Sequence, residues 1–187
     1  MRILGIAGSL RTQSYNRALL SAARELLPEG VELVDFPLLG LPFYDGDVEA
    51  AAVPEPVQRL RDRIAAADAV LFATPEYNRG TSGVLKNAID WASRPARQSV
   101  LDGKPVALVG ATTGISGTAN AQRQVREALL FPGAQTLPQE LLVSRAGEKF
   151  DAEGDLVEPE TRAELKVLLE DLAAWIDQVR EALAVAA

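Results

Sequence analysis

Residues 2–16 of the chain, RILGIAGSLRTQSYN, pass from an apolar run into a polar segment that is rich in turn-forming residues. An apolar run of the length of residues 2–7 predicts a buried β-strand. Residues 8–15 predict a loop, and a helix is expected from residue 16 to about residue 27, where Pro28 ends it. This strand–loop–helix unit is the first part of a parallel sheet with covering helices.

The same alternation continues along the chain. Further strands are expected at residues 31–36, 69–74, 104–111 and 134–143, and further helices at residues 57–67, 82–91, 120–131 and 161–183. Residues 37–56 are expected to form a loop. The pattern predicts an α/β fold in a single domain, residues 1–187: a flavodoxin-like, doubly wound, five-stranded parallel sheet with strand order 2-1-3-4-5. Ligands of such sheets bind beyond the carboxyl ends of the strands, so the loops after strands 1, 3 and 4 are the candidate site.

Composition narrows the possible chemistry. The 187 residues include no histidine and no cysteine. The commonest general base, the commonest metal ligand and any thiolate nucleophile are therefore excluded, and we expect no metal site. Catalysis must then depend on other side chains or on a cofactor. A formal net charge of −7 also argues against a nucleic-acid-binding surface.

No segment of the sequence has the pattern of a membrane or export signal. The first residues become polar too soon for a signal peptide. The apolar run at residues 64–73 is interrupted by Asp68 and is much shorter than a membrane span. We therefore expect a cytoplasmic protein with no membrane partner.

The first loop offers hydroxyl, guanidinium and amide groups at the start of a helix. They belong to Ser9, Arg11, Ser14, Tyr15 and Asn16. Together with the free N–H groups of the first helical turn, they can surround a phosphate dianion. The loop lacks both the Gly-Lys-Ser/Thr ending of a Walker motif and the three glycines of a dinucleotide fingerprint, which favours a terminal phosphate monoester such as that of FMN. A plain helix N-cap by Ser14 or Asn16 is the alternative.

The second loop, TPEYNRGTSG at residues 74–83, combines polar and aromatic groups with two glycines. This combination suits the edge of a planar ring, with backbone amides reaching the heteroatoms of the ring. In the following helix, Trp91 is interpreted as a packing residue, in the core or at a subunit contact. Lys86 and Asp90 are expected to form an exposed i,i+4 ion pair.

The third loop, ATTGISGT at residues 111–118, consists mainly of small residues. Small residues let the backbone approach a flat ligand closely, although a simple strand-to-helix turn would look similar. The acidic segment at residues 151–155 has its glycine at the wrong position for a calcium loop, and we interpret it as a solvated loop.

Taken together, these motifs resemble the NADPH-dependent FMN reductase family, which includes soluble quinone, chromate and azo-dye reductases. The resemblance is carried by GSLR at residues 8–11 with Ser14 and Asn16, by PEYN at residues 75–78 with Gly83, and by LKNAIDW at residues 85–91. GKP at residues 103–105 and the turn at residues 114–117 are similar too, and the collinear match covers roughly residues 2–180. Arg79 and Ser82 depart from the commoner members of the family, in the part of the loop that faces the open side of the flavin.

The resemblance implies that the three loops hold FMN. It implies phosphate contacts from Ser9, Arg11, Ser14 and Asn16, isoalloxazine contacts from Pro75, Glu76, Tyr77 and Asn78, and a ring border formed by Thr113, Gly114 and Ser116. The implied activity is an NAD(P)H-dependent oxidoreductase that passes hydride through FMN to quinones or to other small acceptors, namely flavin, chromate or azo compounds. Either NADPH or NADH would be the electron donor.

No side chain is assigned a catalytic role, because the flavin itself carries the electrons. The resemblance also implies a homodimer or a homotetramer. Trp91 and the helix at residues 120–131 are candidate contacts, because they follow the expected flavin loops and carry apolar residues. The alternative function, from a different class, is that of a non-catalytic electron carrier of the flavodoxin kind.

Overall fold

The computed structural model describes residues 1–186 and contains one five-stranded sheet. Its strands are β1 (Arg2–Ala7), β2 (Glu32–Asp35), β3 (Ala69–Ala73), β4 (Pro105–Ala111) and β5 (Gln135–Val143). The strand order is β2-β1-β3-β4-β5 and every neighbouring pair is parallel, which confirms the expected topology. The register between β4 and β5 shifts once, between Val106 and Leu108. The shift lies next to Pro138 of β5, which has no N–H to donate to the ladder.

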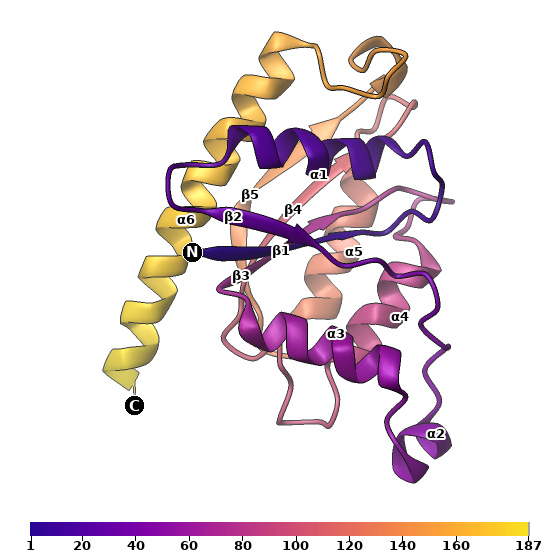
Figure 1. Cartoon of the computed structure of the whole chain (residues 1–187), viewed down its shortest axis with the longest axis vertical. Coiled ribbons are helices and arrows are strands. Elements are labelled where there is room, and N and C mark those ends of the chain that lie inside the picture. The colour runs from indigo at the N-terminus through magenta and orange to yellow at the C-terminus, as the bar shows by residue number, and fades with distance from the viewer. Residues whose placement is uncertain (187) are drawn as a thin grey trace.

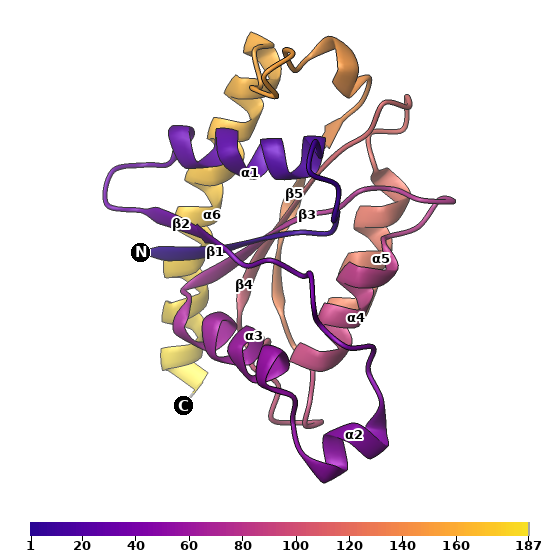
Figure 2. The ribbon, with the colours of Figure 1, turned by 45° about the vertical axis from the view of Figure 1, so that its right-hand side comes forward.

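Helices cover both faces of the sheet. They are α1 (Tyr15–Leu26), α2 (Gly46–Ala51), α3 (Glu55–Ala66), α4 (Gly83–Ala92), α5 (Ala119–Leu130) and α6 (Pro159–Ala186), with a 3₁₀ turn at Ala146–Glu148. Helices α1 and α6 lie on one face, and α3, α4 and α5 lie on the other (Figures 1 and 2). Of the helices described, none combines the length and the apolar character that crossing a bilayer would need.

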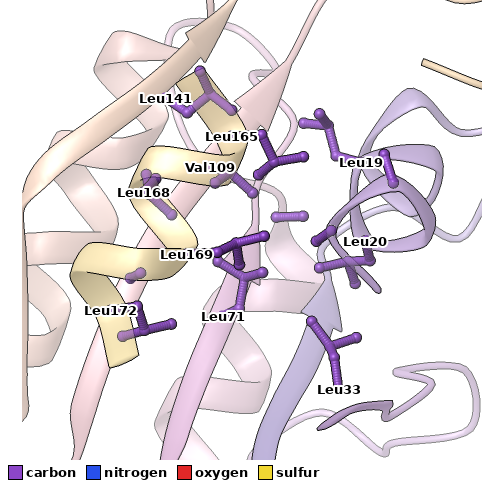
Figure 3. Close-up of a cluster of buried hydrophobic side chains, with 14 of the residues drawn as sticks. Leu19, Leu20, Leu33, Leu71, Val109, Leu141, Leu165, Leu168, Leu169 and Leu172 are labelled. Carbon is purple, nitrogen blue, oxygen red and sulfur yellow. The ribbon is translucent and has the colours of Figure 1, made fainter. Parts of the chain in front are cut away.

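The core on the side of α1 and α6 is built mainly from leucines. The residues labelled in Figure 3 are Leu19, Leu20, Leu33, Leu71, Val109, Leu141, Leu165, Leu168, Leu169 and Leu172. The four leucines of α6 recur at spacings of three and four, so they share one face of the helix and meet the sheet together. All of these side chains are buried, and burial of each stabilises the fold by about 1.5–3 kcal/mol.

Residues 37–56 differ from the expected loop because they contain the short helix α2. Asp45 caps this helix by accepting a hydrogen bond from the backbone N–H of Asp47 at 2.8 Å. Helix α2 buries none of its own residues. Instead, Glu49 accepts hydrogen bonds from Tyr44 at 3.0 Å and from Arg61 of α3 at 3.3 Å. The helix therefore depends on partners that lie outside it.

Trp91 of α4 is buried within the chain, with no exposed surface. Its indole N–H donates to the carbonyl of Pro42 at 2.8 Å, and its ring packs edge-on against Tyr44 at 4.9 Å between ring centroids. The interpretation of Trp91 as a packing residue is confirmed, and its use as a subunit contact is wrong, because a fully covered side chain cannot touch a second chain. On the same helix, Lys86 and Asp90 form the expected exposed ion pair at 2.6 Å.

Candidate functional site

Three loops extend the sheet beyond the carboxyl ends of β1, β3 and β4. Each begins with a backbone N–H that donates to the neighbouring strand: Gly8 to Ala73 at 2.9 Å, Thr74 to Val109 at 2.9 Å and Thr112 to Val143 at 3.0 Å. The loops lie together at the right-hand side of the views in Figures 1 and 2. We name them the first loop (residues 8–14), the second loop (residues 74–82) and the third loop (residues 112–118).

The first and second loops touch at Gly8, directly above the switch point of the sheet. A Cβ at this position would lie 3.0 Å from Pro75 Cδ, 3.0 Å from Ser82 Oγ and 3.1 Å from Leu85 Cβ. Contacts of 3.0 Å are closer than ordinary van der Waals separation, so a larger residue would push the loops apart. Gly8 therefore permits the close approach of the two loops.

The first loop presents polar groups around the amino end of α1. Ser14 is the N-cap of α1, because its Oγ accepts from the N–H of Arg17 at 3.4 Å. Ser9 is buried, whereas the side chain of Arg11 is exposed. The N–H groups of the first turn of a helix have no partner within the helix. The positive end of α1, the two hydroxyls and the nearby guanidinium together form a place for an anion.

The side chains of Asn16 and Tyr15, two residues of this expected site, contact other parts of the chain. The Asn16 amide donates to the carbonyl of Ala111 at 3.0 Å and accepts from the N–H of Ala111 at 2.9 Å. The ring of Tyr15 packs against Phe150, with 5.1 Å between ring centroids. The Asn16 side chain therefore fastens α1 to the end of β4, and the phosphate contact that the resemblance implies for Asn16 stays a prediction.

The second loop contains a tight turn at its tip. Tyr77 and Gly80 exchange two backbone hydrogen bonds, at 2.9 and 3.0 Å, around Asn78 and Arg79. The φ angles of Asn78 and Arg79 are +51° and +62°, as a type I′ turn requires. Tyr77, Asn78 and Arg79 are exposed, and Pro75 is buried beneath them. The turn thus projects three side chains outward beyond the carboxyl end of β3.

Glu76 joins the second loop to the amino end of α5. Its Oε2 accepts from the backbone N–H groups of Asn120 at 2.9 Å and Ala121 at 3.2 Å. Its Oε1 accepts from Asn120 Nδ2 at 3.1 Å and from Ser116 Oγ at 3.5 Å. Partial burial acts to raise the pKa of Glu76, but the hydrogen bonds from Asn120, Ala121 and Ser116 outweigh it and lower the pKa below its ordinary value. The Glu76 carboxylate is therefore engaged by Ser116 and by the amino end of α5, and the implied ring contact of Glu76 stays a prediction.

Residues that the sequence did not single out also hold the second loop. Gln124 of α5 accepts from the N–H of Thr81 at 3.0 Å, and its Oε1 lies 2.7 Å from where a Cβ of Gly80 would stand. Within the loop, the hydroxyls of Thr74 and Thr81 lie 3.0 Å apart. The only sequence signal for Gln124 is its helical spacing of four from Asn120.

The third loop is exposed at its tip and anchored at its base. Thr113, Gly114 and Ser116 are exposed, and the N–H of Gly114 donates to Thr112 Oγ1 at 3.2 Å. At the base, Gly117 has a φ angle of +58°, and a Cβ there would lie 2.7 Å from the carbonyl oxygen of Leu142. Glycine is therefore required at this position for conformation and for space. Thr113, Gly114 and Ser116 thus lie at the exposed tip of the loop, and their contact with a ring stays a prediction.

The acidic segment at residues 151–155 lies across from the first loop. Residues 11–15 and residues 151–155 line the same open hollow, which has a volume of about 570 Å³. The segment turns back on itself, because Asp151 Oδ1 accepts from the N–H of Asp155 at 2.8 Å. Among residues 1–186, no group of three or more histidine, cysteine, aspartate or glutamate residues is arranged to hold a metal ion.

Comparisons with known proteins identify relatives of this chain. The model of the NADPH-dependent FMN reductase family matches residues 1–148. An NAD(P)H-dependent FMN reductase of Pseudomonas aeruginosa is 45% identical over 181 residues, 96% of this chain and 97% of the relative. A 2-hydroxy-1,4-benzoquinone reductase of Burkholderia is 38% identical, over 94% of this chain and 96% of the relative.

Among solved structures, the chain is similar to FerB, a flavoenzyme NAD(P)H:(acceptor) oxidoreductase from Paracoccus denitrificans. The TM-score is 0.86 at 36% sequence identity, and the match covers 95% of this chain and 97% of FerB. The sequence match and the structural match thus both cover nearly the full length of the chain. The chain belongs to the NADPH-dependent FMN reductase family.

Proposed function

We propose that this chain is an FMN-dependent NAD(P)H oxidoreductase that reduces quinones and other small electron acceptors. The observation that carries the proposal is the meeting of three loops at the carboxyl ends of β1, β3 and β4, in a chain that is 45% identical to an NAD(P)H-dependent FMN reductase. Relatives named as quinone reductases, at 38–41% identity, support quinones as the acceptor class.

The residues of the first loop fit a terminal phosphate. Hydroxyl donors from Ser9 and Ser14, the amino end of α1 and the exposed Arg11 guanidinium supply both hydrogen bonds and positive charge. A phosphate at a helix N-terminus gains from both. These groups would bind the phosphate of FMN and so anchor one end of the cofactor.

The second and third loops fit the border of a planar ring. Pro75, Tyr77 and Asn78 on one side, and Thr113, Gly114 and Ser116 on the other, present backbone and small side chains at the open edge of the sheet. When bound, FMN supplies the two-electron chemistry. The two loops would orient it and would leave one side open for the electron donor and the electron acceptor in turn.

The absence of histidine and cysteine is consistent with a chain that binds and orients the cofactor while FMN supplies the chemistry. No side chain has to move a proton if the cofactor carries the reacting electrons, so the chain needs donors and shape rather than a general base. The alternative of a non-catalytic electron carrier is not favoured by the names of the relatives, which are reductases and oxidoreductases.

We also propose that the chain forms a homodimer or a homotetramer. Leu130 and Phe131, at the carboxyl end of α5, are 73% and 86% exposed, which supports a contact of α5 with a second chain. Light scattering at micromolar protein concentration would measure the mass, and a monomer of 20.0 kDa would contradict this part of the proposal.

The function is tested by the visible spectrum of the purified protein and by its response to NAD(P)H. We expect a yellow protein with FMN at one per chain, and bleaching when NADPH or NADH is added without oxygen. Parallel double-reciprocal lines with a quinone are expected, because donor and acceptor would use the same open side in turn. Acid extraction that yields only FAD, or no flavin after reconstitution, would contradict the proposal.

A further inference from the structure

Helix α5 lacks a side-chain cap of its own. Thr118 occupies the N-cap position with a φ angle of +72° and makes no side-chain capping hydrogen bond. Its hydroxyl instead accepts from Gln122 Nε2 at 3.2 Å. The first N–H groups of a helix need partners from outside the helix, and a helix with no local cap loses about 1 kcal/mol of stability.

Glu76 supplies the missing cap from 44 residues earlier in the chain. One carboxylate oxygen accepts from the backbone N–H groups of Asn120 and Ala121, at 2.9 and 3.2 Å. The other accepts from Asn120 Nδ2 at 3.1 Å and from Ser116 of the third loop at 3.5 Å. A single carboxylate thus contacts the second loop, the third loop and the amino end of α5.

These contacts join the two loops that we assign to the flavin ring. Glu76 belongs to the second loop and lies between Pro75 and Tyr77, whereas Ser116 belongs to the third. Gln124 of α5 holds the second loop at another point, through the N–H of Thr81. Helix α5 is therefore the element through which the two sides of the ring site are kept in register.

We propose that Glu76 is a positioning residue that holds the two ring loops together and places a negative charge between them and α5. This inference rests on the proposed function, because it concerns the site of FMN. The amino end of a helix carries about half a positive charge, which favours extra electrons nearby. The Glu76 carboxylate offsets that charge, so it disfavours the reduced cofactor relative to the oxidised one.

The charge is tested by Glu76→Gln, which keeps an acceptor oxygen but removes the negative charge. We expect the midpoint potential of bound FMN to rise, with the ratio of the dissociation constants of oxidised and reduced FMN changing by up to about tenfold. For a two-electron couple, a tenfold change corresponds to about 30 mV. An unchanged midpoint potential would overturn the electrostatic part of the proposal.

The positioning is tested by Glu76→Ala, which removes all four hydrogen bonds. In the protein without FMN, we expect faster hydrogen exchange at the amides of Asn120 and Ala121. With FMN, we expect binding to weaken about tenfold, or about 1.4 kcal/mol. Unchanged exchange at these two amides would show that Glu76 does not hold α5, and would overturn the positioning role.

Glu158→Gln is the matched control. Glu158 also caps a helix with its carboxylate. It stands directly before α6, its Oε2 accepts from the N–H of Thr161 at 2.7 Å, and it lies in neither ring loop. We expect this variant to alter exchange at Thr161 and to leave the FMN affinity and midpoint potential unchanged. If Glu158→Gln changed them as much as Glu76→Gln does, the proposal would be wrong.

The outcomes separate this inference from the proposed function. If the wild-type chain binds no FMN, the proposed function fails and the role of Glu76 at the ring fails with it. If the wild-type chain binds FMN and both Glu76 variants bind it with unchanged affinity and potential, only the role of Glu76 is overturned.

Discussion

The first loop and the pair formed by the second and third loops bind the rest of the molecule in different ways. In the first loop, Arg11 is exposed and the Ser14 side chain bonds only three residues along the chain. In the pair of ring loops, Glu76 and Thr81 bond residues of α5 that lie 43 to 45 positions away. At the proposed phosphate end, the side chains of Arg11 and Ser14 make no hydrogen bond to a distant residue within residues 1–186, whereas at the proposed ring end the second loop is tied to a distant helix.

Because of this difference, we expect substitutions at the two ends to differ in their effects on FMN affinity and on stability. A side chain that contacts only solvent and ligand can change affinity without changing the fold, because no protein partner loses a bond when it is removed. A side chain that ties two loops to a helix changes stability and affinity together. Replacing an exposed side chain at the phosphate end, such as that of Arg11, should therefore affect FMN binding alone, and substitutions at the ring end should affect both.

The largest effect is expected for Gly110→Ala, beneath the ring loops. The new Cβ would overlap Thr118 Oγ1 and lie 2.5 Å from the carbonyl oxygen of Thr74, a backbone atom that cannot turn away. We expect a loss of about 3 kcal/mol in the free energy of unfolding, with weaker FMN binding, because overpacking shifts both loops. Urea unfolding measures the loss. Gly83→Ala is the control, because a Cβ there meets nothing within 4 Å, and an equal loss in this control would contradict the prediction.

Arg11→Ala tests the phosphate end. Removing one charge-assisted hydrogen bond costs roughly 1.5–3 kcal/mol, so FMN should bind about 10- to 150-fold more weakly. The free energy of unfolding of the protein without FMN should stay the same, because the side chain is exposed. Titration followed by flavin fluorescence measures the affinity. Arg59→Ala on α3, which breaks an exposed ion pair with Glu55, should leave FMN affinity unchanged.

The turnover of Arg11→Ala provides a second test of the same prediction. With excess FMN, Arg11→Ala should regain the turnover of the wild type, because Arg11 is proposed to bind the phosphate and not the reacting ring. Turnover that stays low at saturating FMN would place Arg11 at the ring end and break the comparison between the two ends.

Ser14→Ala should have a smaller effect, which includes both FMN affinity and the free energy of unfolding. The variant loses a neutral hydrogen-bond donor to the phosphate, worth about 1 kcal/mol, and it also loses the N-cap of α1. We expect FMN binding to weaken about fivefold and the free energy of unfolding to fall by about 1 kcal/mol. Ser14→Asn, which can still cap, should restore stability more than affinity. Equal recovery of both would argue against a phosphate contact from Ser14.

The smallest effect is the dependence of stability on pH at the ring end. The pKa of Glu76 in the folded chain lies below its ordinary value of 4.5. Its ionised form therefore stabilises the fold above that value, and the stabilisation is lost as the pH falls through the folded pKa. The difference in unfolding free energy between the wild type and Glu76→Gln should be constant near neutral pH and shrink below about pH 4.5. Solvent screens this half-buried group, so the difference is small, and a difference that grew with acidity would contradict the prediction.

The sheet and its main helices could be predicted from the sequence because the signal for them is local. The apolar run at residues 2–7 predicts a buried strand, and the leucine spacing of α6 predicts the buried face of that helix. Neither prediction needs knowledge of distant residues. Helix α2 could not be predicted in this way. It has six residues, buries none of them and depends on contacts of Glu49 with Tyr44 and Arg61, which lies 12 positions away.

The candidate site also has features that the sequence predicts and features that it does not. The loops that carry the polar groups could be predicted, because strand–helix alternation indicates a doubly wound sheet and ligands bind beyond the strand ends of such sheets. Which of their side chains are free to contact a ligand depends on the folded structure. The Asn16 amide is bound to Ala111, 95 positions away, and the Glu76 carboxylate caps a helix 44 positions away. A hydrogen bond between distant residues produces no periodic pattern in the sequence. Whether a polar side chain points into the protein or toward solvent is therefore decided by the packing of the folded chain.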